Sequence, residues 1–181
     1  MKVFSRQYFE DLLSTASKSQ RLRANANVHH SYADLCQKLF NAIKVNSYIR
    51  PHRHSLDPKD ECLIAIKGLF GFIMFSNQGL IESVILFGSE KYSEKLSIPS
   101  GLELPSGVWH TVVSLEDESI LFEVKSGPFN PSLAKEFALW APEEGSENAP
   151  QYLETLKQKC LSELSNIQIK VKFQSDYRFV D

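Results

Sequence analysis

The chain has 181 residues, of which 43% are hydrophobic and 23% charged, enough to bury the core of one domain. Twenty basic and 22 acidic residues give a net charge of −2, which argues against a general nucleic-acid binder and a polybasic membrane surface. No apolar run approaches the about 20 residues that span a bilayer, and the N-terminus lacks a secretory signal. The three cysteines, Cys36, Cys62 and Cys160, are few and odd in number. This usage predicts a cytoplasmic protein without a disulfide framework.

Two helices are predicted in the N-terminal part. Ser5 can cap a first helix over residues 6–18. Ser31 opens a second at 32–43, because apolar residues recur there at helical spacing: Tyr32, Leu35, Leu39, Phe40 and Ile43. The polar stretch RLRANANVHH between them is too poor in apolar residues for a core element. Its alternating arginines and asparagines, Arg21, Arg23, Asn25 and Asn27, also fit an extended strand with polar groups facing a cavity.

After Asn46 the sequence changes to short strands separated by turn residues. The predicted strands are SYIRPHRH, ECLIAIKG, GFIMFSN, LIESVILF, SEKLSIP, GVWHTVVSL and ESILFEVKSG. Seven strands in about 80 residues, without helical patterns between them, predict an antiparallel sandwich or barrel.

The C-terminal part is predicted to hold a helix and a strand. Pro150 begins a helix over 150–164. The tail NIQIKVKF alternates apolar and polar residues, which predicts a half-buried strand that completes a sheet or pairs with a second subunit. The expected organisation is a helical extension (1–45), a β-barrel (46–130) and a helix with a terminal strand (131–181), together one structural domain.

Three histidines and a carboxylate form the candidate metal site. His52 and His54 lie two apart on a predicted strand, so both point to one face. Glu61 begins the next strand, and His110 lies in PSGVWH. Such a mixed nitrogen and oxygen site suits one divalent transition metal, Fe, Mn, Ni, Co or Zn.

Those residues resemble the two motifs of the cupin superfamily: HRH, then Glu61 and Gly68 with six residues between them, then PSGVWH. The usual first motif has a shorter gap between the second histidine and the glutamate, which leaves Asp57 and Asp60 as rivals to Glu61. The Glu61-to-Gly68 spacing favours Glu61. The resemblance implies a mainly β fold, a double-stranded β-helix or jelly-roll barrel.

A closer resemblance, to the WbuC family of cupin-fold metalloproteins, covers roughly residues 21–154. Its segments are NVHH, YIRPHRH, PSGVWHTVV, FEVKSGPFNP and FALWAPEEG. The resemblance implies a bacterial cytoplasmic protein encoded among genes for O-antigen (lipopolysaccharide) or other surface-polysaccharide synthesis. It implies a metal but no established reaction.

Four further residues are candidates for substrate binding and catalysis. Arg50 and Tyr48 share the face of His52 on the predicted strand. An inward Arg50 favours an anionic substrate, whereas an Arg50 at the mouth of the barrel would form an ordinary ion pair. Tyr48 also fits core packing. Glu123 and Lys125 share a face in FEVKSG. Both side chains would ordinarily be exposed to solvent. If they instead point inward beside the metal, the pair can act as acid and base.

Two functions are compatible with this site. The first is a small metalloenzyme, an isomerase or epimerase or a dioxygenase, acting on a sugar or sugar nucleotide. The second is a non-catalytic metal-containing sugar-binding or regulatory module. The expected partners are an anionic sugar derivative and a second copy of the chain in a homodimer. His29, His30 and the tail strand stay unassigned.

Overall fold

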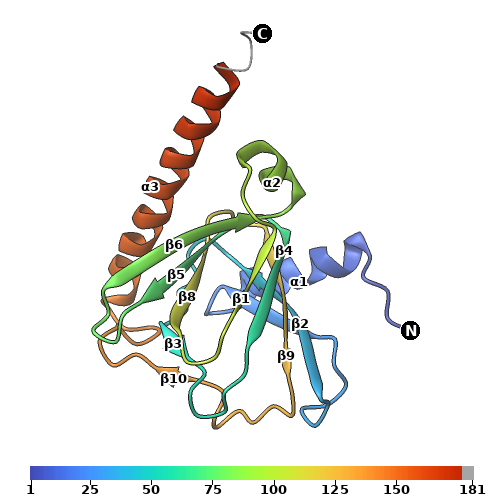
Figure 1. Ribbon diagram of the computed structural model, residues 1–181. Coiled ribbons are helices and arrows are strands. Elements are labelled where there is room, and N and C mark those ends of the chain that lie inside the picture. Colours follow the sequence, from blue (N-terminus) through green and yellow to red (C-terminus); the bar gives the residue numbers. More distant parts are fainter. Residues whose placement is uncertain (177–181) are drawn as a thin grey trace.

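The β-strands form two antiparallel five-stranded sheets in the computed structural model, which describes residues 1–176 and the side chains of residues 1–168 (Figure 1). Sheet A has the order β1 (Arg23–Asn27), β2 (Cys36–Ile43), β9 (Ser119–Ser126), β4 (Glu61–Lys67) and β7 (Gly101–Leu104). Sheet B has the order β10 (Glu136–Phe137), β3 (His52–Arg53), β8 (Trp109–Ser114), β5 (Leu69–Phe75) and β6 (Ile81–Gly88). The chain passes back and forth between the sheets from β3 to β9, as in a jelly roll. This confirms the predicted mainly β fold.

A single residue, Gly68, connects β4 to β5 and carries the chain from one sheet to the other. Its φ of +90° lies in the region that favours glycine. A Cβ atom there would stand 2.2 Å from Oγ of Ser119. The glycine of the sequence motif is therefore required by both backbone conformation and space.

The two sheets enclose an apolar core over part of their length. Its buried members come from seven strands of the two sheets: Ile43, Leu63, Ala65, Phe70, Phe72, Phe87, Leu104, Val112 and Leu121. The remaining interior forms a cavity lined by both polar and apolar side chains, and it holds the candidate site.

Strand β2 replaces the helix predicted at 32–43, and that prediction is wrong. Phe40 and Ala42 pack in the cluster beneath the N-terminal helix, whereas Ile43 lies in the core between the sheets. A strand covered on both faces carries apolar residues on both, so its sequence resembles a buried helix. The polar segment before it forms β1, which pairs with β2 from Arg23 to Asn27. The extended alternative for this segment is confirmed.

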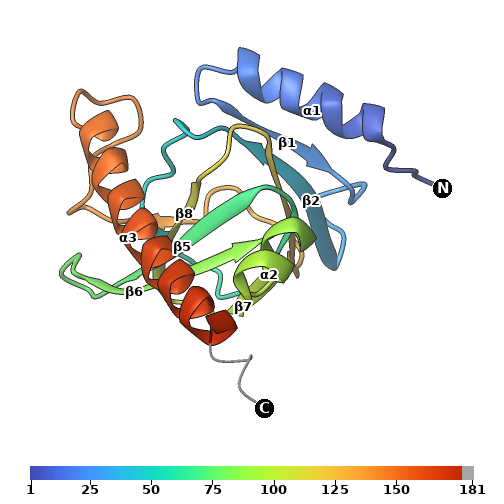
Figure 2. The same cartoon turned by 90° about the horizontal axis from the view of Figure 1, so that it is seen from above.

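Helix α1 (Arg6–Lys18) is the first predicted helix, and it is confirmed together with its cap. The hydroxyl of Ser5 accepts a hydrogen bond from the backbone nitrogen of Tyr8 at 3.2 Å. The helix buries Leu12 and Ala16 against the outer face of sheet A. From above, α1 and α3 lie on different sides of the barrel (Figure 2).

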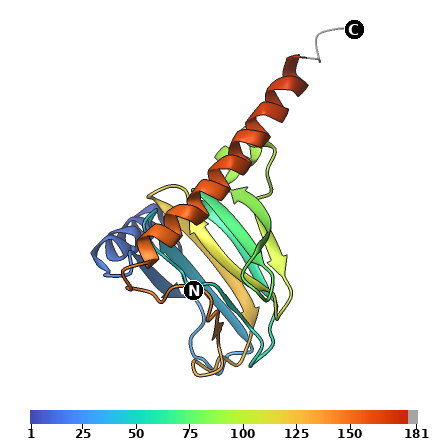
Figure 3. The ribbon, with the colours of Figure 1, turned by 90° about the vertical axis from the view of Figure 1, so that its left-hand side faces the viewer.

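Helix α3 (Ala149–Asp176) packs against β5, β6 and β8 and then extends past the sheets (Figure 3). It confirms the helix predicted at 150–164 and runs further, so the strand predicted for NIQIKVKF is wrong; the side chains of its last five residues lie outside the described part. Helix α2 (Glu90–Leu96) likewise occupies most of the predicted strand SEKLSIP. Within residues 1–176, no helix has the length and apolarity needed to cross a membrane.

Candidate metal centre

His52, His54 and His110 converge on one point between the sheets, as their positions on the strands predict. His52 and His110 are direct partners across β3 and β8, and their ring centroids lie 4.5 Å apart. His54 lies on the same side as His52, with ring centroids 5.3 Å apart. One ring nitrogen from each of the three lies within 4.8 Å of the others. All three residues are at most 5% exposed, so the cluster is a buried feature of the fold.

Backbone carbonyl groups fix the orientation of all three imidazole rings. Nδ1 lies 3.0 Å from the Arg50 oxygen in His52 and 2.8 Å from the Val108 oxygen in His110. Nδ1 of His54 lies 2.5 Å from the Ala134 oxygen. A carbonyl oxygen only accepts, so each Nδ1 carries the proton and each Nε2 presents a lone pair. Metal-binding histidines are held in this way.

His52 and His110 are also in the charge state that a metal requires. Burial lowers the pKa of His52 well below its usual value, and the charges of Lys135 and His110 lower it further. Burial lowers the pKa of His110 to about 4, although Glu61 opposes the shift. Both rings are therefore neutral near pH 7, with lone pairs available for coordination.

Glu61 lies beside the three histidines. Its Oε1 is 3.1 Å from Nε2 of His54, and its Oε2 is 3.9 Å from Nε2 of His110. Burial alone would raise the pKa of Glu61, but its contacts with His54 and Lys125 hold it well below the usual value. The residue is therefore a buried carboxylate.

The donor set fits a divalent transition metal. Nε2 of His54 is buried and has no hydrogen-bond partner in the described part of the chain, although a carboxylate oxygen lies 3.1 Å away. The His54 lone pair and the Glu61 carboxylate both face the point where the histidines converge, and a cation bound there would satisfy the two groups together. Three imidazoles would hold the ion, and Glu61 stands where it can add a fourth ligand.

The rival carboxylates occupy other places. Asp57 forms an ion pair with Lys59 at 2.6 Å. Oδ1 of the exposed Asp60 accepts a hydrogen bond from the backbone nitrogen of Ser106 at 2.8 Å. The structure thus brings Glu61 alone of the three candidate carboxylates within 4 Å of the histidines.

Glu123 and Lys125 point inward and line the cavity. Nζ of Lys125 lies 2.8 Å from Oε1 of Glu61 and 2.6 Å from Oε1 of Glu123. The amide of Asn41 donates to the other Glu123 oxygen at 2.9 Å. Although burial lowers the pKa of Lys125, the charges of Glu123 and Glu61 outweigh it and raise the pKa. A continuous polar chain therefore runs from Asn41 to the metal centre.

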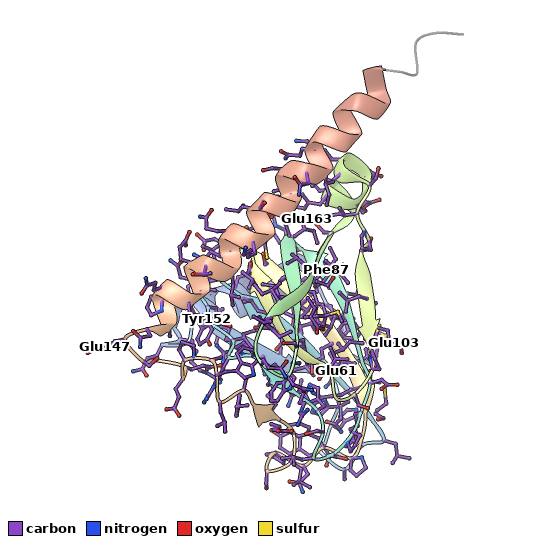
Figure 4. All side chains as sticks on the ribbon, turned by 60° about the vertical axis from the view of Figure 1, so that its left-hand side comes forward. Glu61, Phe87, Glu103, Glu147, Tyr152 and Glu163 are labelled. Carbon is purple, nitrogen blue, oxygen red and sulfur yellow. The ribbon has the colours of Figure 1, made fainter. Side chains whose placement is uncertain are left out.

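A cavity of about 560 Å³ opens beside the histidines, within the range of small-molecule sites. In Figure 4, Glu61 lies in the interior between the sheets, whereas Glu103 lies at the outer edge. The predicted alternating residues Arg21, Arg23, Asn25 and Asn27 all line this cavity. A small molecule can therefore contact both the centre and the polar face of sheet A.

Arg50 lines the cavity and forms an ion pair there, whereas Tyr48 is not one of the residues that line it. Nε of Arg50 donates to the Ala138 oxygen at 3.0 Å, and Nη1 lies 3.5 Å from Glu143. Tyr48 is buried in the core beneath α3, and its hydroxyl donates to the Pro142 oxygen at 2.9 Å. Tyr48 therefore packs in the core, the alternative considered for it above, and its hydrogen bond holds the loop of residues 141–146.

Sequence reasoning missed several cavity residues, among them Lys135 and Gln37. Lys135 follows Ala134, whose carbonyl holds His54. Burial lowers the pKa of Lys135, and Glu61 and Glu123 oppose this. Lys135 lies in a segment without periodic pattern, and the apolar spacing around Gln37 predicts a helix, so no sequence signal locates either residue in the cavity.

Comparisons with known proteins agree with this fold. A family model described as a domain of unknown function (DUF6016) matches residues 4–87. No curated protein matches the chain. Protein SO0799 from Shewanella oneidensis has a TM-score of 0.51 at 12% identity, with 71% of this chain and 82% of that one covered.

Two other solved structures resemble the chain more weakly. An RmlC-like cupin protein from Desulfovibrio desulfuricans has a TM-score of 0.42 at 14% identity, with coverages of 57% and 81%. Oxalate decarboxylase from Bacillus subtilis, described with Mn(II) centres, has a TM-score of 0.45 at 15% identity; the match covers 65% of this chain and 28% of that one. The two-sheet jelly-roll topology follows from the strand order, and the resemblance to the WbuC family stays a prediction.

Proposed function

We propose that this protein is a metal-dependent enzyme that acts on a sugar or sugar nucleotide in surface-polysaccharide (O-antigen) synthesis. The metal-binding part of this proposal is supported by three buried imidazoles, each of which has its Nδ1 hydrogen-bonded to a backbone carbonyl. The cavity beside them supports a small-molecule substrate. The pathway rests on the resemblance to the WbuC family.

The metal, when bound, would supply Lewis acidity toward a carbonyl or hydroxyl oxygen of the substrate. The chain's own acid–base groups adjoin it. Lys125 keeps its proton because two carboxylates surround its ammonium group, so it donates hydrogen bonds to developing negative charge. Glu123, held by Lys125 and Asn41, is the group that accepts a proton from the substrate. An inward pair of groups that can remove and return a proton favours isomerisation or epimerisation over oxygenation.

Positive side chains around the cavity support an anionic substrate. Arg21, Arg50 and Lys135 line it together with Lys125. Guanidinium groups bind carboxylates and phosphates through paired hydrogen bonds. We assign Arg50 to the anionic part of the substrate.

The inward position of Glu123 and Lys125 favours an enzyme over a non-catalytic sugar-binding module. A sensor requires no proton-transfer group beside its metal, and two such groups cost desolvation energy to bury. The loss of isomerisation in a Glu123→Gln variant that still binds substrate would establish the catalytic role. Unchanged turnover would exclude it.

Metal analysis tests the first step of this proposal. We expect the purified wild-type protein to hold about one equivalent of a transition metal, and His52→Ala and His110→Ala to lose it. The matched control is His30→Ala, because His30 is exposed. Equal metal content in all four proteins would contradict the metal centre. A thermal-shift panel of nucleotide sugars and sugar phosphates then tests the substrate class, and no stabilisation by any of them would contradict it.

A further inference from the structure

His29 and Gln37 form a buried polar corner of the cavity that the proposed chemistry does not use. Both line the cavity, and they are 7% and 1% exposed. Nε2 of His29 and Oε1 of Gln37 have no hydrogen-bond partner within residues 1–176. Buried polar atoms are nearly always paired, so two unpaired atoms on one cavity wall call for a ligand.

The backbone of β2 determines the tautomer of His29. Nδ1 lies 2.9 Å from the oxygen and 3.2 Å from the nitrogen of Lys38. The Lys38 oxygen already accepts from the backbone nitrogens of Val28 and His29. The Lys38 N–H is a fixed donor, and a protonated Nδ1 would oppose it. We therefore assign Nδ1 as the acceptor of the Lys38 N–H, which leaves the proton on Nε2 as a donor without a partner.

Three carbonyl groups determine the orientation of the Gln37 amide. Its Nε2 lies 2.8 Å from the Asp34 oxygen and 3.2 Å from each of the Ser31 and Tyr32 oxygens. Only the amide nitrogen can donate to these three carbonyl oxygens, so Nε2 faces them. Oε1 is then the acceptor that has no partner. The corner thus offers one unpaired donor and one unpaired acceptor.

The sheet register places this corner in line with the metal centre. Gln37 on β2 pairs with Lys125 on β9, and Lys125 pairs with Glu61 on β4. Two strand spacings separate Gln37 from Glu61, about 10 Å. An extended six-carbon ligand bound at this corner can therefore reach past Lys125 toward the metal centre.

The geometry points to a subsite in which His29 and Gln37 bind a hydroxyl group of a polyhydroxylated carboxylate or phosphate. Hydroxyl groups both donate and accept, so those of a polyhydroxylated ligand can accept from Nε2 of His29 and donate to Oε1 of Gln37. The rings of Tyr32 and Phe129 line the same cavity, 5.0 Å apart between centroids, and offer apolar surface to the carbon chain. This inference rests on the proposed function in taking the cavity as the substrate site.

Binding of D-gluconate and of hexanoate to the metal-loaded protein tests the subsite. The two anions share a six-carbon chain and a carboxylate, but only gluconate carries hydroxyl groups. The variant is His29→Asn, because the asparagine oxygen can replace Nδ1 as the acceptor for Lys38 while Nε2 is removed. The control is His30→Asn at the exposed neighbouring histidine. Calorimetry gives the dissociation constants, metal content is measured on the same samples, and thermal melting checks folding.

We expect His29→Asn to weaken gluconate binding about tenfold, the effect of one or two lost hydrogen bonds. Hexanoate affinity and metal content stay unchanged, and His30→Asn behaves as the wild type. In the wild-type protein, gluconate but not hexanoate shifts the ¹⁵N resonance of His29 Nε2, a measurement that needs no variant.

Unchanged gluconate affinity in His29→Asn would overturn the subsite, as would the absence of gluconate binding by metal-loaded wild-type protein. A wild-type protein that holds no metal but still prefers gluconate through His29 would support the subsite and contradict the proposed metalloenzyme. The two proposals therefore fail in distinguishable ways.

Discussion

Lys125 and Glu61 form a buried ion pair, with 2.8 Å between Nζ and Oε1, at the side of the three-histidine cluster. Their side chains are 10% and 6% exposed, and the same ammonium group contacts Glu123 at 2.6 Å. One cation therefore compensates two carboxylates in the interior.

Replacing Lys125 is expected to make folding depend on the metal. Lys125→Met leaves two buried carboxylates without their cation, which lowers the free energy of unfolding of the metal-free protein by about 3–5 kcal/mol. A bound divalent ion compensates part of that charge, so added metal stabilises the variant more than the wild type. Urea unfolding with and without metal measures both effects. An equal loss of stability in the two forms would contradict this account.

The metal-free protein is expected to lose stability below pH 6.5. The pKa of His110 is about 4 in the folded protein, below the usual 6.5, so the unfolded chain binds more protons between these values. The free energy of unfolding therefore falls as the pH decreases, by roughly 3 kcal/mol for one such shift; the lowered pKa of His52 acts in the same direction. Urea unfolding between pH 7.5 and 4.5 measures the slope. His110→Gln should give a shallower slope, and parallel curves would count against the assignment.

The loop over the cavity is expected to depend on Glu144. Nη2 of Arg23 lies 2.7 and 2.6 Å from its two carboxylate oxygens, and the Arg50 backbone nitrogen donates to it at 3.3 Å. Glu144→Gln removes the charge from these bonds and should cost about 1–2 kcal/mol, with faster amide hydrogen exchange in residues 141–146. Glu143→Gln is the matched control, because the Glu143 side chain is 81% exposed. Equal effects of both variants would refute the role of Glu144.

A side chain at position 71, where the structure has Gly71, is expected to destabilise the packing of α3 against sheet B. A Cβ atom there would lie 2.2 Å from Sγ of Cys160 and 3.2 Å from its Cβ. Gly71→Ala should therefore lower the free energy of unfolding by about 1–3 kcal/mol. Adding Cys160→Ala removes the clashing sulfur and should restore part of that loss. A double-mutant cycle by chemical unfolding measures the coupling, and strictly additive effects would show that the residues do not meet.

The sequence predicts fold class better than the type of each element. The strands from β4 to β6 and β8 to β9 follow patterns of β-branched and aromatic residues that need no tertiary information. Strand β2 does not, because its two faces are buried by different partners, Phe40 by α1 and Ile43 by the opposite sheet. The tail NIQIKVKF has a strand-like alternation, yet it continues the long helix α3. In these segments tertiary context outweighs local pattern.

The residues of the candidate site also differ in how well the sequence predicts their position. His52, His54, Glu61 and His110 stand in short motifs, so their spacing alone indicates that they meet. The roles of Gln37 and Lys135 depend on which strands become neighbours, for example Gln37 opposite Lys125. Sheet register is a long-range property, and a single sequence does not specify it.

The carbonyl groups that orient the imidazoles differ in their distance along the chain. His52 and His110 use oxygens two residues before them, Arg50 and Val108, whereas His54 uses Ala134, 80 residues later. The orientation of two histidines therefore depends only on the backbone next to them, whereas that of His54 depends on the docking of the segment around Ala134. Metal affinity should consequently report whether that distant segment is docked.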